Sequence, residues 1–138
     1  MRLHKNAKIE LIRKVPLFSQ CTKKELAAIA AQADELTLSE DRVLVRQGER
    51  GREFVVIAEG SADVHRNGRR INRLGAGDFL GEIALLSDRP RTATVTTTSP
   101  TRVLVLTDGA FRRVTTELPS VLTRLLAVLS ERLHADAV

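Results

Sequence analysis

The chain has 138 residues, of which 43% are hydrophobic and 28% charged, a globular composition that excludes a disordered protein. Its net charge of +5 is compatible with any anionic partner, but the charges are scattered and fit a solvated surface. The length predicts one domain over residues 1–138. Because Cys21 is the single cysteine and no apolar run approaches the roughly 20 residues of a membrane span, we expect a cytoplasmic protein with no internal disulfide and no membrane span.

Two short helices are predicted in residues 1–35. Apolar residues among charges favour an amphipathic helix over Lys5–Lys14, and Pro16 ends it because proline disfavours helical backbone at the preceding residue. Thr22 and Glu25 have the spacing of a capping box, which predicts that a second helix begins after Thr22. The residues expected on one face of this second helix are Leu26, Ile29, Ala30 and Ala33.

Residues 36–106 change to short stretches rich in branched side chains, separated by turn signals. Asn67-Gly68 predicts the tip of a hairpin, and the almost wholly apolar stretch Phe54–Ala58 predicts a strand buried on both faces. Strands at this spacing favour a sandwich or a barrel. The predicted strands are Leu36–Leu38, Val43–Val45, Phe54–Ala58, Ala62–His65, Ile71–Leu74, Thr94–Thr98 and Arg102–Leu106.

Residues 107–138 predict two more helices. Thr107-Asp108 can cap the first, which runs to Glu117, and Pro119 suits the first turn of the second. The second has an apolar stripe that could close the barrel or form a dimer seam. The stripe comprises Leu122, Leu125, Leu126, Leu129 and Leu133, widened by Val121 and Val128. No helix-turn-helix fits after Pro119, so the sequence shows no DNA-binding motif.

The segment Gly77–Val95 contains the residues that indicate a ligand. Gly81 allows a ligand close to the backbone because it has no Cβ, and the apolar turn after it would present free N–H groups to an anion. Arg91 offers a planar fork that fits two phosphate oxygens. Ionised Glu82 only accepts hydrogen bonds and therefore suits a hydroxyl. The combination predicts a small anionic ligand that carries a sugar.

The runs Phe79–Leu86 and Pro90–Thr94 resemble the phosphate-binding cassette of cyclic nucleotide-binding domains. In that family a glutamate holds the ribose 2′-hydroxyl, an arginine holds the cyclic phosphate, and amides of a short helix complete the anion site. The resemblance places the cassette at residues 79–95 and assigns the first two roles to Glu82 and Arg91. The site residues that it implies are Phe79, Leu80, Gly81, Glu82, Ile83, Ala84, Arg91, Thr92 and Ala93.

The resemblance also implies an α+β, mainly β, fold: an antiparallel jelly-roll barrel of about eight strands, flanked by N-terminal helices and by C-terminal hinge and lid helices. It implies a non-catalytic regulatory module that binds a cyclic purine nucleotide without a cofactor, with cAMP expected ahead of cGMP. Thr92 leaves the base open, because a hydroxyl residue at its position occurs in both cAMP and cGMP binders of the family. Leu126, Leu129 and Leu133 are candidate lid residues, and an effector protein or self-association through the last helix is the expected further partner.

Other signals in the sequence favour other functions less. The three histidines, His4, His65 and His134, fall in different predicted elements and offer no converging metal or catalytic set. Arginines flank the predicted hairpin tip, but no aromatic platform accompanies them, so we interpret them as a solvated loop. They are Arg66, Arg69, Arg70 and Arg73. A ligand-free jelly roll that serves as an interaction scaffold and a basic nucleic-acid-binding protein remain the alternatives.

Overall fold

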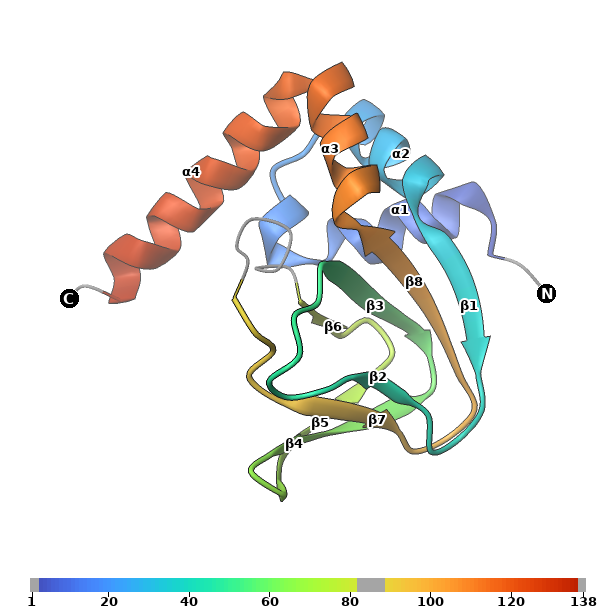
Figure 1. Ribbon diagram of the computed structural model, residues 1–138. Coiled ribbons are helices and arrows are strands. Elements are labelled where there is room, and N and C mark those ends of the chain that lie inside the picture. Colours follow the sequence, from blue (N-terminus) through green and yellow to red (C-terminus); the bar gives the residue numbers. More distant parts are fainter. Residues whose placement is uncertain (1–2, 82–88, 137–138) are drawn as a thin grey trace. The chain divides into compact units, whose positions relative to one another are not determined.

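The computed structural model describes residues 3–81 and 89–136 and shows two compact units (Figure 1). The β unit is Asp34–Asp108 and holds the strands, and the helical unit combines Met1–Ala33 with Gly109–Val138. That the whole chain acts as one domain stays a prediction.

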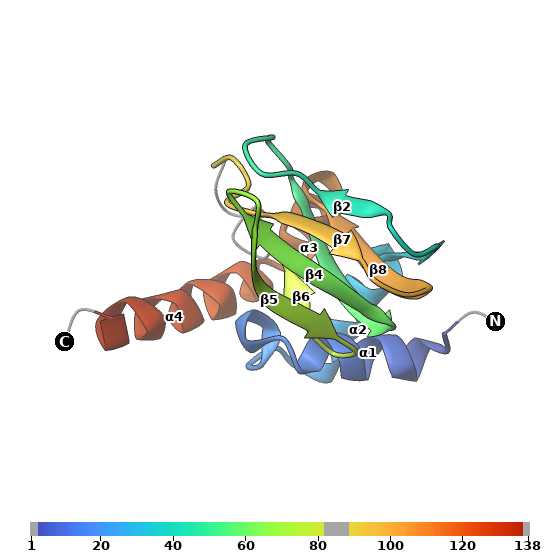
Figure 2. The same cartoon turned by 90° about the horizontal axis from the view of Figure 1, so that it is seen from below.

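The strands of the β unit form two antiparallel four-stranded sheets, in the orders β1-β8-β3-β6 and β2-β7-β4-β5. Figure 2 shows the second sheet with its strands side by side. The described strands are β1 Asp34–Leu38, β2 Val43–Val45, β3 Glu53–Glu59, β4 Ser61–Arg66, β5 Arg69–Gly75, β6 Phe79–Leu80, β7 Thr94–Thr97 and β8 Thr101–Thr107. Apolar side chains from both sheets meet in one core, whose buried members are Val55, Ile57, Ala62, Val95 and Val103. The predicted mainly β jelly roll flanked by helices is therefore confirmed.

Each strand expected from the sequence is present within about two residues of its predicted ends. The strand β6 was not predicted as such, because two residues between glycines are too short to show an alternating pattern. It pairs with β3, Leu80 opposite Val55 and Phe79 opposite Val56. This pairing places the start of the cassette on the sheet that contains β3.

The β3 strand is apolar because four consecutive side chains are buried: Phe54, Val55, Val56 and Ile57. Full burial of each such side chain contributes about 1.5–3 kcal/mol. The strand pairs with β8 along one edge and, at Val55 and Val56, with β6 on the other, so backbone groups on both edges of its buried centre are paired. The expectation of a strand buried on both faces is confirmed.

The hairpin between β4 and β5 turns at Asn67 and Gly68, as predicted. Both residues have positive φ, 53° and 79°, which is the backbone of a type I′ turn and matches the twist of the two strands. Two hydrogen bonds between Gln47 and Asn67, one donated by each residue, hold this tip in place, so the end of β4 is a fixed part of the wall of the β unit.

The helical unit contains α1 Lys5–Arg13, the short 3-10 helix η1 Pro16–Phe18, α2 Lys23–Gln32, α3 Asp108–Glu117, which begins at the last residue of the β unit, and α4 Pro119–Asp136. The capping box is confirmed: the Thr22 hydroxyl accepts from the Glu25 amide at 3.2 Å, and the Thr22 amide donates to the Glu25 carboxylate at 2.7 Å. Among the described residues no helix combines the length and apolar character needed to cross a bilayer.

The buried face of α4 differs from the predicted leucine stripe. Val121, Leu125 and Val128 are buried, whereas Leu122 and Leu126 are 38% and 54% exposed. The spacing 121-125-128 is one helical face, and α4 contacts η1, so packing selects a face that the abundance of leucines does not reveal. The side chains of Leu129 and Leu133 lie outside the described part of the chain.

Glu25 does more than cap α2. Its carboxylate is buried and accepts hydrogen bonds from the Ser120 hydroxyl at 2.5 Å and from Arg124 Nε at 2.7 Å, so it joins α2 to α4. Burial alone would raise the pKa of Glu25, but the hydrogen bonds from Ser120 and Thr22 and the charge of Arg124 outweigh it, and the pKa lies below its ordinary value. The sequence did not predict this contact, because its partners lie at least 95 residues away.

We expect Glu25→Gln to lower the free energy of unfolding at pH 7 by about 2 kcal/mol, because it leaves Arg124 without its carboxylate partner. Breaking a fully buried ion pair costs about 3–5 kcal/mol, but the Arg124 side chain is 40% exposed and can regain water. The folded-state pKa of Glu25 is below its unfolded value. The stabilisation is therefore complete above the ordinary glutamate pKa of about 4.3 and is lost as the pH falls from there through the folded-state pKa.

Urea unfolding at pH 7 and at acidic pH measures this effect. The difference between wild type and Glu25→Gln should shrink as the pH falls. Glu10→Gln is the control, because within the part of the chain that the structure describes Glu10 forms only an exposed pair with Arg13, at 3.3 Å. A Glu25 variant as stable as the Glu10 variant at pH 7 would show that the buried contact does not stabilise the helical unit.

Candidate functional site

The β unit contains a cavity of about 420 Å³. Its apolar wall comes from both sheets and consists of Val45, Val64, Leu74, Phe79, Leu80 and Val95. The polar part of the wall comes from the end of β4 and from residues 89–92. A cavity of this volume, mostly apolar with a few polar groups, has the properties of a small-molecule site.

The structure brings most of the predicted site residues to this cavity. Six of them line it: Phe79, Leu80, Gly81, Arg91, Thr92 and Ala93. Glu82, Ile83 and Ala84 lie outside the described residues. Their assignment to a ligand, like that of the other six, stays a prediction.

The guanidinium of Arg91 lies between two glycines. A Cβ on Gly51 would be 2.7 Å from Arg91 Nη2 and closer still to Nε, and a Cβ on Gly81 would overlap Nη1. Nη2 also donates to the Glu53 carbonyl at 2.7 Å. Gly81 has a φ of +80°, a conformation that glycine adopts without strain. The close approach of two backbone segments therefore fixes the arginine and explains why both neighbours lack a side chain.

The backbone of Arg91 is fixed as firmly as its side chain. Its amide donates to the Glu49 carbonyl at 2.9 Å, and its carbonyl accepts from the Gly48 amide at 2.8 Å. Arg50 forms a β-bridge with Pro90 beside these bonds. The segment 48–53 and the end of the cassette thus form one local structure, although about 40 residues separate them.

The charge of Arg91 is not neutralised within the described residues. None of their carboxylates forms an ion pair with it, and its buried Nε has no hydrogen-bond partner among them. Burial lowers the pKa of Arg91 below its ordinary value, and the nearby charge of Glu53 opposes this only in part. A partly desolvated cation without a counter-charge is costly, so an anion bound in the cavity would stabilise this arrangement.

Comparison with known proteins identifies the family. The family model described as "Cyclic nucleotide-binding domain" matches residues 35–117. The chain belongs to the cyclic nucleotide-binding domain family. The match includes the β unit except its first residue, Asp34, together with the cavity and α3, so the resemblance seen in the sequence is confirmed.

Two relatives are cAMP-dependent protein kinase regulatory subunits. The one from Mycosarcoma maydis is 35% identical over 119 residues, which is 80% of this chain and 23% of that protein. The one from Dictyostelium discoideum is 31% identical over 133 residues, 91% of this chain and 41% of that protein. This cyclic nucleotide-binding domain thus spans less than half of either relative. A solved structure, the N-terminal domain of a transcriptional regulator from Streptomyces coelicolor A3(2), has a TM-score of 0.86 at 30% identity, with 92% of each chain covered.

The two threonines of the cassette differ in their surroundings. Thr94 has a structural contact, because its hydroxyl accepts from the Gln47 amide at 2.9 Å. Thr92 lines the cavity, and its carbonyl accepts from Arg66 Nε at 3.1 Å. Of the two, Thr92 is the one that lines the cavity of this cyclic nucleotide-binding domain.

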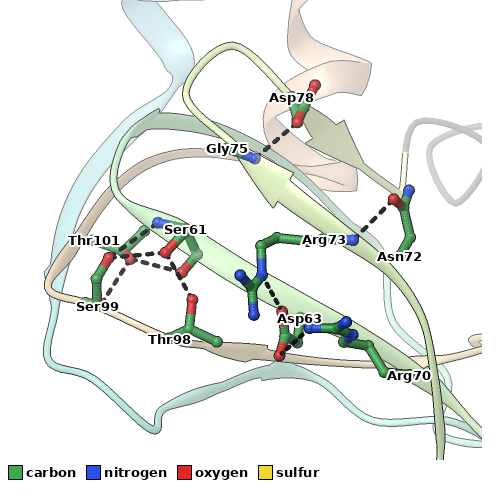
Figure 3. A network of polar contacts seen from close by, with 10 residues as sticks. All are labelled: Ser61, Asp63, Arg70, Asn72, Arg73, Gly75, Asp78, Thr98, Ser99 and Thr101. Carbon is green, nitrogen blue, oxygen red and sulfur yellow. Dashed lines mark hydrogen bonds and ion pairs between the residues drawn. The ribbon is translucent and has the colours of Figure 1, made fainter.

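The sequence suggested that the four hairpin arginines all belong to a solvated loop, but the structure shows that they are not equivalent. Arg73 and Arg70 lie on Asp63, at 2.8 Å and 4.0 Å, and Figure 3 shows these contacts. Arg66 is exposed, as expected of a loop residue, but it also lines the cavity. The alternation of β4 contained the signal: Ala62 and Val64 face the core, and Arg66 is the next residue with the same parity.

Proposed function

We propose that this domain reversibly binds a 3′,5′-cyclic purine nucleotide and catalyses no reaction. One observation carries the proposal: Arg91 is held, without a counter-charge among the described residues, on the wall of a cavity of nucleotide size. In this proposal Arg91 binds the cyclic phosphate, Glu82 accepts a hydrogen bond from the ribose 2′-hydroxyl, and amides around Ile83, Ala84 and Ala93 complete the anion site.

The energetics are compatible with a reversible signal. Moving the singly charged phosphate out of water requires compensation. Each charge-assisted hydrogen bond contributes about 1.5–3 kcal/mol, and the fork of Arg91 can form two. Together with the amides and the apolar wall, these bonds support micromolar affinity, about −8 kcal/mol, once the cost of association is subtracted.

The names of the two kinase regulatory subunits make cAMP the first ligand to test. The cGMP nucleotide is the second candidate, because Thr92 and a cation, Arg66, both line the cavity. Either nucleotide would use the same phosphate contact to Arg91, so the choice of base does not affect the proposal above.

We further propose that binding is relayed through the C-terminal helices to an effector protein or a second copy of the chain. A path of contacts supports this. Gly51 touches Arg91, and the next residue, Arg52, is bonded to Asp108, the first residue of α3. The Asp108 amide donates to the Arg52 carbonyl at 2.8 Å, and the two side chains pair at 3.3 Å. A ligand can shift α3 only by its different affinity for two arrangements of this path.

A titration followed by backbone amide NMR tests both parts. We expect cAMP and cGMP to bind in the micromolar range and 5′-AMP at least about ten-fold more weakly, because its open, doubly charged phosphate does not match the site. Amides of residues 48–53, 91–93 and α3 should shift together. No response to any nucleotide would favour the non-binding scaffold. Shifts confined to the cavity, with α3 and α4 unchanged, would contradict the relay.

A further inference from the structure

Arg66 is directed into the cavity by the strand that carries it. It is the last residue of β4, on the same face as Ala62 and Val64, and it lines the cavity with Val64 and Thr92. Its Nε donates to the Thr92 carbonyl at 3.1 Å. The guanidinium is therefore oriented by the backbone of the cassette, although the two residues are 26 positions apart.

The backbone under Arg66 is clamped. The next residue, Asn67, donates its amide to Gln47 Oε1 at 2.9 Å, and its own side-chain oxygen accepts from Gln47 Nε2 at 2.8 Å. The backbone N–H of Gln47 in turn donates to the Thr94 hydroxyl. A side chain carried on a fixed backbone loses less conformational freedom when it binds a ligand, so Arg66 is suited to a specific contact.

Most hydrogen-bond donors of Arg66 are unused within the described residues. Its Nε is occupied by Thr92, and among the described residues no further hydrogen bond or ion pair uses the other four of its five N–H groups. Arg70 and Arg73, by contrast, both form ion pairs with Asp63. A guanidinium fork matches two acceptors in one plane. Guanine and hypoxanthine present such a pair, O6 and N7, whereas adenine presents N7 beside an amino group, which is itself a donor.

The phosphate and the base would thus meet different arginines. Arg91 is held by Gly51, Gly81 and Glu53, and Arg66 by Thr92. We propose that Arg66 is a specificity-determining residue of this cavity and donates hydrogen bonds to O6 and N7 of a 6-oxo purine. It therefore raises the affinity for cGMP and cIMP relative to the affinity for cAMP. This inference rests on the proposed function, because it needs the cyclic nucleotide in the cavity.

The test is the ratio of dissociation constants for cAMP, cGMP and cIMP, measured by calorimetry on the wild-type chain and on Arg66→Leu and Arg66→Gln. Arg66→Leu should weaken cGMP and cIMP on the order of ten-fold more than cAMP, which corresponds to about 1.4 kcal/mol. Arg66→Gln should move the ratio further toward cAMP, because a glutamine amide matches adenine N6 and N7. The cIMP nucleotide has O6 and N7 but lacks the 2-amino group of cGMP. An effect of the Arg66 variants on cIMP therefore reports the Arg66 contact alone, without any contact between Thr92 and the 2-amino group.

Arg70→Gln is the matched control, since it removes the same charge from the same hairpin, on the face of Asp63. It should leave all three ratios unchanged. If Arg66→Leu weakens the three nucleotides equally, Arg66 only attracts anions and the inference is overturned, while the proposed function stands. Unchanged ratios in both Arg66 variants overturn it as well. A wild-type chain that binds none of the three overturns the inference together with the proposed function.

Discussion

Arg91→Ala should weaken the binding of cAMP and cGMP at least about ten-fold, and on the order of 10²- to 10⁴-fold if both hydrogen bonds of the fork are lost at about 1.5–3 kcal/mol each. The loss should be similar for the two nucleotides, because they share the phosphate. Stability should fall little, since among the described residues only the Glu53 carbonyl loses its donor. Calorimetry gives the affinities, and urea unfolding gives the stability.

Two further variants separate the geometry of Arg91 from its charge. Arg89→Ala removes the same charge from the cavity wall, at an exposed residue, and should lose less affinity, with a difference that salt reduces. Arg91→Lys keeps the charge but loses the planar fork and should fall between wild type and Arg91→Ala. Wild-type-like affinity in Arg91→Ala would remove this residue from the phosphate site.

Gly81→Ala should damage both the fold and the site. The backbone has a φ of +80° there, which costs a residue with a Cβ about 1–2 kcal/mol. The new Cβ would also be 2.6 Å from the Glu53 carbonyl oxygen, which is backbone, and would overlap Arg91 Nη1. Because the carbonyl cannot move easily, we expect a total loss of about 2–4 kcal/mol of stability and at least about ten-fold of nucleotide affinity.

The chain provides a matched control for this prediction. Gly77 has a φ of +90°, but a Cβ there would meet nothing within 4 Å, so Gly77→Ala introduces the strain without the collision. Its nucleotide affinity should stay near that of the wild type. Gly51→Ala does the reverse, because Gly51 has no positive φ and the three atoms nearest to a Cβ there all belong to the Arg91 guanidinium, the end of a flexible side chain. It should lose affinity but little stability. Equal behaviour of the Gly81 and Gly77 variants would contradict the proposed packing around Arg91.

Much of the fold could be predicted from local patterns. The branched stretches, the Asn67-Gly68 turn and the Thr22–Glu25 capping box depend on neighbours within a few positions, and each is present in the structure. The predicted inward face of α4 was partly wrong: Val121, Leu125 and Val128 are buried as expected, but Leu122 and Leu126 are exposed. The many leucines fit several faces, and tertiary packing decides which face is buried. The role of Glu25 was missed for the same reason, since Ser120 and Arg124 are distant in the sequence.

The candidate site divides in the same way. The cassette residues Gly81 and Arg91 are close in sequence, and their spacing carried the family resemblance that the comparisons confirm. Gly51 and Glu53, which hold Arg91 from the other side, gave no signal, because only the bonds between segments 48–53 and 90–91 bring them together. Arg66 could have been found from the alternation of β4, had the hairpin not been interpreted as a loop.

The distance between the phosphate of a bound nucleotide and Arg91 is the most direct test of the proposed site, and a crystal structure of the chain with cAMP would measure it. We predict two phosphate oxygens within about 2.7–2.9 Å of the Arg91 guanidinium, on the cavity wall that Arg91 shares with Gly81. A nucleotide whose phosphate lies away from Arg91, or outside the cavity lined by Phe79 and Thr92, would contradict it.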